Sequence, residues 1–207
     1  VCNRLDHIQK VDHGIWLLEK DLEKFRHIHK KVPDFNLTIL DDINKFEACL
    51  DVMDRCLCTS YDIETITIGE DEENLDGKLL RYVLPFIDFG IDHWEDAEEY
   101  EVAIQLMQEI NKKAMPKCMH NGMYDATHSI VYHAEPMNYV LDTLAFAHAE
   151  FSELPKTLDF VASYTLPDYI FWKDEAELAS KKKDIRAYWM YNARDTWYTM
   201  RICIEQL

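Results

Sequence analysis

The sequence predicts an α/β fold in which a central mixed β-sheet is flanked by helices. The chain has 207 residues, of which 48% are hydrophobic, and this is enough for one substantial core. Segments rich in β-branched and aromatic residues come early in the chain. Segments with helical spacing of apolar residues alternate with them and then dominate, which is typical of a layered α/β architecture.

The first predicted element is an amphipathic helix between residues 12 and 31. Its apolar residues recur at spacings of three, four and three, while the other face is charged. Pro33 ends this helix. Residues 1–32 are therefore predicted to be an N-terminal helical extension that packs on residues 33–207 or on a neighbouring domain. The apolar residues of the helix are Ile15, Leu18, Leu22 and Phe25.

Strands dominate the next part of the chain. Residues 35–40 are predicted as a short strand, and Asp41 or Asp42 caps a helix that runs to about Asp54. A strand then leads from Arg55 to Asp62. Residues 65–69 and 79–87 are predicted as two further strands joined by the acidic turn 70–78.

Helices dominate from residue 95 onwards. A helix is predicted over residues 95–113, and Pro116 precedes a short strand over residues 117–120. A second helix begins near Asn121, and residues 138–141 form another predicted strand. The rest is predicted to be helical, with breaks around Pro155 and Pro167.

The charge argues against a protein that grips duplex nucleic acid over a broad basic face. The formal net charge is −17. Residues 70–101 hold twelve acidic residues against Lys78 and Arg81, so this stretch alone accounts for −10. Most of the acidity is therefore predicted to be a local, solvated surface.

Cysteine and histidine usage indicates an intracellular protein without a zinc site. The six cysteines are too scattered for a disulfide framework, and none forms a Cys-x-x-Cys pair. The nine histidines include no convincing set of four zinc ligands. No apolar run approaches the ~20 residues that a membrane helix needs, so no membrane partner is expected. Because the chain begins with Val1 and not Met, we expect a fragment of a longer protein.

Two carboxylates at and just after the end of the second predicted strand suggest a metal site. In an extended strand Asp62 and Glu64 point to the same face, while Tyr61 points to the other. Adjacent carboxylates repel each other unless a cation lies between them, and oxygen-only ligands suit Mg²⁺ or Mn²⁺. Taken alone, the pair also fits an ordinary strand end with two solvated acids.

Two later segments place further polar residues four positions apart on helices. Asn121 and Asp125 share a face at a helix start, and Tyr191 and Asp195 share a face of a helix rich in aromatic residues. Each also fits a structural role alone, as helix cap, as partner of the helix dipole or as half-buried core. In combination with Asp62 and in this order, they are much more specific.

The combination resembles the 3′–5′ exonuclease domain of family A DNA polymerases, particularly that of phage members. This resemblance covers roughly residues 35–207 and implies the ribonuclease H-like fold of the DEDD exonucleases. The family's Asp-x-Glu-Thr, His-Asn-x-x-(Tyr or Phe)-Asp and Tyr-x-x-x-Asp motifs are matched by Asp62-Ile63-Glu64-Thr65, His120-Asn121-Gly122-Met123-Tyr124-Asp125 and Tyr191-Asn192-Ala193-Arg194-Asp195. Two further stretches also look like this family, namely Asp142-Thr143 and Leu154-Pro155-Lys156-Thr157-Leu158.

One feature departs from the family pattern. The family usually has a loop and then an apolar strand after its first motif, whereas here Thr65 runs directly into Ile66-Thr67-Ile68-Gly69. Either the hairpin is shortened, or a loop is absent from the chain.

The resemblance implies phosphodiester hydrolysis with two divalent ions, Mg²⁺ or Mn²⁺. Asp62, Glu64 and Asp195 would hold the ion that activates water, and Asp62 and Asp125 would hold the ion that stabilises the leaving 3′-oxygen. Tyr191 and Glu64 would orient the water. Two residues would support the site without binding metal, namely Asn121 and Thr65.

The implied substrate is a single-stranded or frayed DNA 3′ end. A polymerase domain would follow Leu207, and the protein would act in the cytoplasm of a bacterium or of a phage-infected cell. Single strands are usually held by stacking on aromatic side chains, and Phe171 and Trp172 are the candidates here, although core packing also suits such residues.

Two alternatives stay open. A stand-alone exoribonuclease resembling RNase D would use the same chemistry on RNA. A catalytically idle scaffold domain would instead contact replication proteins through the acidic surface, but it would be expected to lack a motif carboxylate, and all four are present.

Overall fold

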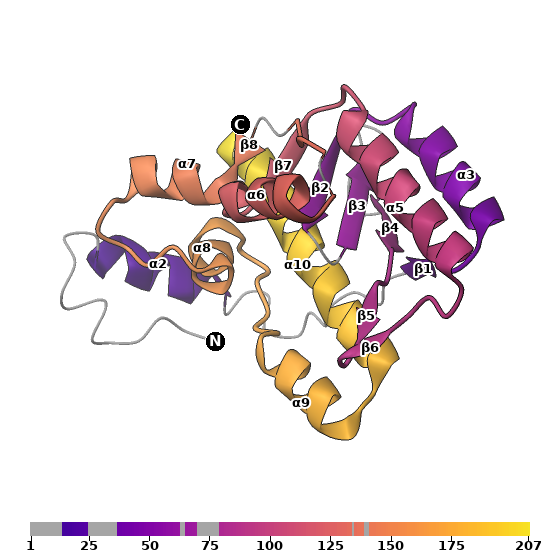
Figure 1. Ribbon diagram of the computed structural model, residues 1–207. Helices are drawn as coiled ribbons and strands as arrows, with labels where there is room; N and C mark the ends of the chain where they lie inside the picture. The colour runs from indigo at the N-terminus through magenta and orange to yellow at the C-terminus, as the bar shows by residue number, and fades with distance from the viewer. Residues whose placement is uncertain (1–13, 25–36, 63–64, 70–78, 134, 139–140) are drawn as a thin grey trace.

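The computed structural model describes residues 14–24, 37–62, 65–69, 79–133, 135–138 and 141–207 (Figure 1). A six-stranded sheet forms its centre, with strand order β1-β4-β3-β2-β7-β8. The strands are β1 (Leu37–Ile39), β2 (Cys58–Asp62), β3 (Thr65–Gly69), β4 (Leu79–Val83), β7 (Lys117–Met119) and β8 (Leu141–Asp142).

The sheet is mixed, as predicted. Strands β2, β3 and β4 form an antiparallel meander, whereas β1 pairs with β4, β7 with β2 and β8 with β7 in parallel. Parallel neighbours end at the same edge of a sheet, so the carboxyl ends of β2, β7 and β8 lie together. Motif residues follow at this edge.

The hairpin between β2 and β3 is short. Asp62 pairs with Thr65, and the register continues to Cys58 opposite Gly69. Both sequence-based alternatives, a shortened hairpin and a loop absent from the chain, fit this register and stay predictions. Glu64 itself lies outside the residues that the structure describes.

The predicted strand over residues 79–87 is wrong in its extent. It ends at Val83, and Ile87–Asp88 (β5) instead pairs with Ile91–Asp92 (β6) in a separate two-stranded sheet. Pro85 explains the break, because proline donates no hydrogen bond to a ladder. The two-residue turn between β5 and β6 takes left-handed backbone angles at Phe89 (φ 52°) and Gly90 (φ 87°), which suit a tight hairpin.

Helices α3 (Ile43–Met53) and α5 (Ala97–Lys112) cover one face of the sheet (Figure 1). Asp42 caps α3 by accepting a hydrogen bond from the amide of Lys45, and this identifies it among the two predicted caps. The core on this face joins α3 and α5 to strand residues. It includes Phe46, Met53, Tyr61, Tyr82, Leu106, Ile110 and Met119.

The long helix α10 (Ile185–Gln206) crosses the opposite face and contacts β2, β3, β4 and β7 (Figure 1). Helices α7 (Thr143–Glu150), α8 (Leu158–Thr165) and α9 (Asp174–Lys182) pack against it. The predicted breaks at Pro155 and Pro167 separate α7 from α8 and α8 from α9. A further break falls between α9 and α10, at Lys183, which has a left-handed φ of 51°.

Part of the predicted N-terminal helix is present as α2 (Gly14–Lys24). Its Leu17 is fully buried in the core around α8 and α10, and Trp16 contacts the rings of Phe151 and Tyr164. Residues 25–36, where the helix was expected to continue and end, lie outside the described residues.

Within the described part of the chain, none of the helices combines the length and hydropathy that a membrane span requires. The five cysteines of this part are all free thiols.

Candidate active site

Three motif carboxylates line one cavity of about 660 Å³. Asp62 comes from the end of β2, Asp125 from the first turn of α6 (Gly122–His133) and Asp195 from the middle of α10. Asp125 and Asp195 are almost fully buried. The described carboxylates of the three predicted motifs thus converge on one space, although they are up to 133 positions apart in the sequence.

The sheet and α10 bring these carboxylates together. Within β2, Cys58 and Met200 of α10 are in contact, with their sulfur atoms 3.7 Å apart. Side chains alternate along a strand, so Asp62 projects to the same face as Cys58, toward α10. Asp195 lies on α10, about one and a half helical turns before Met200.

The turn before α6 is held by Asp142, the last residue of β8. Its carboxylate accepts hydrogen bonds from the backbone amides of Asn121 and Gly122, both at 3.0 Å, and from that of Leu144 at 2.9 Å. Asn121 has a left-handed φ of 67°, which costs energy in a non-glycine residue. Asp142 offsets this cost and fixes the start of the helix that carries Asp125.

The side chain of His120, in the same turn, is also held by hydrogen bonds. Its Nε2 donates to the carbonyl oxygen of Lys156 at 2.8 Å, and its Nδ1 lies 2.8 Å from the hydroxyl of Thr143. Burial lowers the pKa of His120 and outweighs the opposing effect of the Lys156 carbonyl. The imidazole is therefore neutral, carries its hydrogen on Nε2, and ties the turn to the segment before α8.

The carboxylate of Asp195 accepts hydrogen bonds from two neighbouring side chains. Lys173 Nζ lies 2.9 Å from its Oδ1 and 2.8 Å from its Oδ2, and Trp172 Nε1 donates to Oδ1 at 2.5 Å. This carboxylate is therefore neutralised and oriented by two residues that belong to none of the three motifs.

Tyr191 lies one turn before Asp195 and shares the same lysine. Its hydroxyl oxygen is 3.2 Å from Lys173 Nζ. Burial and the charge of Asp195 raise the pKa of Tyr191, so the phenol stays protonated at neutral pH. The phenol therefore keeps its hydrogen, and the Asp195 carboxylate is a hydrogen-bond partner for it.

The remaining predicted site residues differ in where they lie relative to the cavity. Asn121 lines the cavity, and Thr65 pairs with Asp62 in the sheet. The expectation that Trp172 stacks on substrate is wrong, because its ring is 1% exposed and is stacked on Tyr198 at 4.0 Å. Phe171 is half-buried against the core around α10, and its role as a stacking surface stays a prediction.

The carboxylate oxygens that line the cavity are suitable ligands for a divalent ion, but in the described part of the chain they do not surround a single point closely enough to form a metal site. Among the described residues, no three His, Cys, Asp or Glu side chains form a metal-binding group. Glu64, the fourth predicted ligand, is not among them. Three carboxylates around one cavity are nevertheless the oxygen donors that Mg²⁺ and Mn²⁺ prefer, so the residues fit such ions.

The motifs did not predict Lys173, which contacts both carboxylate oxygens of Asp195. It is 22 positions away from Asp195, and no spacing rule connects the two. The one available signal was compositional, since lysine and arginine together number 22 against 39 acidic residues. A cation in so acidic a chain is readily paired with a carboxylate, but the composition does not say which one.

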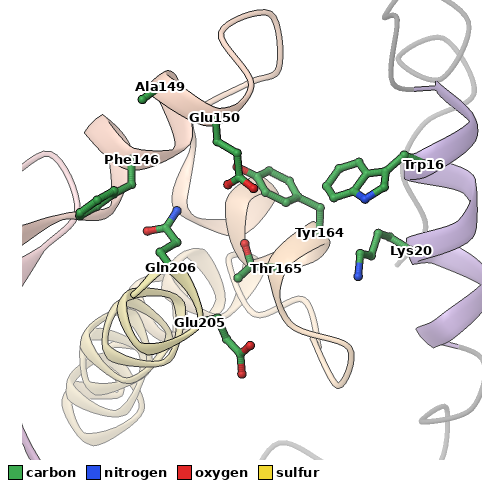
Figure 2. A pocket seen from close by; sticks show the side chains of 9 residues that line it. All are labelled: Trp16, Lys20, Phe146, Ala149, Glu150, Tyr164, Thr165, Glu205 and Gln206. Carbon is green, nitrogen blue, oxygen red and sulfur yellow. The ribbon is translucent and has the colours of Figure 1, made fainter.

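A second cavity, of about 530 Å³, lies between α2, α7, α8 and the end of α10 (Figure 2). Aromatic side chains of Trp16, Phe146 and Tyr164 line it together with Glu150 and Gln206. It contains none of the motif residues.

Comparisons with known proteins find similarity in structure only. No model of a protein family matches the sequence, and no curated protein matches it. The structure of Trypanosoma brucei RNase D in complex with RNA U12 is similar with a TM-score of 0.59 and 12% identity, over 83% of this chain and 62% of that one. Escherichia coli RNase D, an exoribonuclease involved in structured RNA processing, is similar with a TM-score of 0.53 and 16% identity, over 83% of this chain and 45% of that one.

These similarities confirm the predicted fold class. The chain has the ribonuclease H-like exonuclease fold, with a central sheet flanked by helices, and it spans less than two thirds of either RNase D. Neither comparison supports the narrower resemblance to the proofreading domain of a DNA polymerase.

Proposed function

We propose that this domain is a metal-dependent 3′–5′ exonuclease that removes nucleotides from single-stranded 3′ ends. The observation that carries the proposal is the convergence of Asp62, Asp125 and Asp195 on one cavity within a ribonuclease H-like exonuclease fold. Asp62, Glu64, Asp125 and Asp195 would hold two divalent ions. When bound, such ions stabilise the charge that develops during in-line displacement at phosphorus.

The reaction is the hydrolysis of the terminal phosphodiester bond. The water oxygen joins phosphorus, the bond from phosphorus to the 3′-oxygen breaks, and that oxygen takes up a proton. The products are a nucleoside 5′-monophosphate and a strand with a new 3′-hydroxyl. In this reaction Tyr191 would orient the water, while Trp172 holds Asp195 and Asp142 holds the turn before Asp125.

The comparisons favour RNA as the substrate. Both similar structures are RNase D enzymes, and one of them was determined with RNA. A stand-alone RNase D-like exoribonuclease, proposed as an alternative from the sequence, therefore gains support over proofreading.

A proofreading exonuclease of a family A DNA polymerase is the second candidate. Its support is the form of the second motif, from His120 to Asp125, and the stretch from Leu154 to Leu158, both of which look like that family. A polymerase domain after Leu207 belongs to this candidate.

One assay tests the proposal and separates the two candidates. The 207-residue chain is incubated with 5′-labelled single-stranded DNA and RNA of the same sequence, with and without Mg²⁺. We expect metal-dependent ladders that shorten from the 3′ end. Preference for RNA supports the RNase D-like function, and preference for DNA supports proofreading.

Matched variants make the assay specific. Asp125→Asn and Asp195→Asn should each abolish digestion, because each replaces a negatively charged metal ligand with a neutral amide. Asp159→Asn, which removes a carboxylate from the same cavity but from no motif, should digest within a fewfold of the wild-type rate. Metal-independent digestion, or none by the wild type, contradicts the proposal, and the second result favours the scaffold interpretation.

A further inference from the structure

Lys173 occupies the place beside Asp195 that a metal ion bound to both carboxylate oxygens would take. Its Nζ lies almost equally far from the two carboxylate oxygens, at 2.9 and 2.8 Å, which is the place of a chelated cation. Oδ1 also accepts the hydrogen bond from Trp172. Since a carboxylate oxygen has two lone pairs, the pairs of Oδ1 are already in use.

The lysine is held in this position by its surroundings. Its ammonium group lies 5.2 Å from the ring centres of both Trp172 and Tyr191, within the range of a cation–π contact. The backbone before it is also anchored, because the Tyr198 hydroxyl of α10 donates to the carbonyl of Ile170 at 3.0 Å and lies 3.2 Å from its amide nitrogen. The contact with Asp195 is therefore a built feature of the fold.

A cation is required here when no metal is bound. Asp195 is 9% exposed, and a carboxylate buried to that extent is costly without a compensating charge. A divalent ion would supply that charge, but it would have to take the same oxygens. Lys173 and a metal ion bound to both oxygens of Asp195 therefore exclude each other.

We propose that Lys173 is a resident counter-cation of the active site, which neutralises Asp195 in the metal-free domain and is displaced when a divalent ion binds. Lys173 is then a positioning residue that sets the metal concentration at which the site becomes loaded. This inference rests on the proposed function, because it takes Asp195 as a metal ligand.

Calorimetric titration with Mn²⁺ in the absence of nucleic acid tests the inference. Lys173→Met removes the competing charge and keeps a side chain of similar length. We expect this variant to bind Mn²⁺ at least about fivefold more tightly than the wild type. We also expect Mn²⁺ to raise its melting temperature by more than it raises that of the wild type, because the metal-free variant leaves Asp195 uncompensated.

Lys156→Met is the matched control. Lys156 lines the same cavity, but its Nζ donates to main-chain carbonyls, including that of Phe151 at 2.7 Å. This variant removes the same charge from the cavity without freeing a motif carboxylate, so its gain in Mn²⁺ affinity should be smaller. Equal gains in both variants would show a general charge effect and overturn the inference.

A double-mutant cycle makes the test specific for Asp195. In an Asp195→Asn background, Lys173→Met should leave the Mn²⁺ affinity unchanged. If Lys173→Met does not fold, Lys173→Gln replaces it throughout. An unchanged or weaker Mn²⁺ affinity of the single variant overturns the inference, and metal-dependent digestion by the wild type would then leave the proposed function standing. Absence of Mn²⁺ binding by the wild type overturns both.

Discussion

Tyr191 and Lys173 form a hydrogen bond whose direction is fixed by chemistry. An ammonium group can only donate, so the Tyr191 oxygen accepts at 3.2 Å, and its own hydrogen is shared with the carboxylate of Asp195. The proposed role of Tyr191 requires this hydrogen to turn from Asp195 to the attacking water.

Tyr191→Phe removes only this hydroxyl and keeps the ring. If the hydroxyl orients the attacking water, the single-turnover rate should fall by ~10²–10³, as for loss of one preorganised donor, while Mn²⁺ affinity persists. Quenched-flow digestion of a single-stranded oligonucleotide measures the rate. Tyr188→Phe, one turn earlier on α10 with its ring 6.3 Å from that of Tyr191, should retain the wild-type rate. Equal rates for all three proteins would make Tyr191 a packing residue.

At this scale the sequence could predict residues with a fixed spacing and could not predict their partners. Asp125 and Tyr191 were found because the helical repeat places each four residues from another polar group. The contact between Lys173 and Asp195 depends instead on the path of the chain between α8 and α9, which contains no repeating pattern. The burial of Trp172 depends on the same path, so its assignment as a stacking surface was wrong.

Asp142 links three elements and is more than a helix cap. It ends β8 and caps α7 through the amides of Leu144 and Ala145, at 2.9 and 3.4 Å. The same carboxylate receives the amides of Asn121 and Gly122 at the start of α6. Four backbone donors therefore depend on one side chain.

Asp142→Ala should destabilise the domain by about 2–3 kcal/mol, because it removes a cap and leaves two further amides without an acceptor. Asp96→Ala is the matched control, since Asp96 caps α5 through the amides of Glu98 and Glu99 only, and it should cost about 1 kcal/mol. Urea denaturation gives both values. Equal losses would mean that the contacts of Asp142 with the turn before α6 contribute little to stability.

Elements with a clear helical spacing of apolar residues, or with a proline near their ends, were predicted well. The apolar spacing of α5 and the prolines around α8 gave boundaries close to those observed. The hairpin β5–β6 was missed because its strands have only two residues each, which is too short for an alternating pattern. The feature that marks this hairpin is its turn, where Phe89 and Gly90 adopt left-handed backbone angles.

For the whole molecule, the mixed sheet and its flanking helices followed from the order of strand and helix patterns. The layer to which each helix belongs did not, because amphipathic helices such as α5 and α8 could cover either face. Packing decides this. Phe46 and Ile110 join the core of one face, whereas Leu158 and Trp197 join the other. Residues of α10 line both the active-site cavity and the cavity in Figure 2.

Alkaline pH should test how tightly the whole domain is packed. Burial raises the pKa of Tyr61, Tyr164 and Tyr169 above the usual value of 10.0, so these phenols ionise in the unfolded chain first. The unfolded state then binds fewer protons, and stability falls as the pH rises above 10, by roughly 4 kcal/mol per pH unit for three such groups.

Lys117 opposes this loss over part of the range. Its side chain is fully buried in β7, and burial lowers its pKa from 10.5 to about 8. Between these values the unfolded chain holds a proton that the folded protein lacks, so the contribution of Lys117 to stability rises with pH. The hydrogen bonds from Nζ to the carbonyls of Asn111 and Lys113, at 3.3 and 2.8 Å, favour the ammonium form and limit this rise.

The unfolding free energy of the wild type, minus that of Lys117→Met, should therefore increase from pH 8 to pH 10.5, by at most about 3 kcal/mol. Taking the difference cancels the tyrosines, because both proteins contain them. Chemical denaturation at half-unit steps of pH provides the two curves. If they stay parallel across this range, Lys117 remains protonated in the folded protein, and its hydrogen bonds to the end of α5 outweigh the cost of burying the charge.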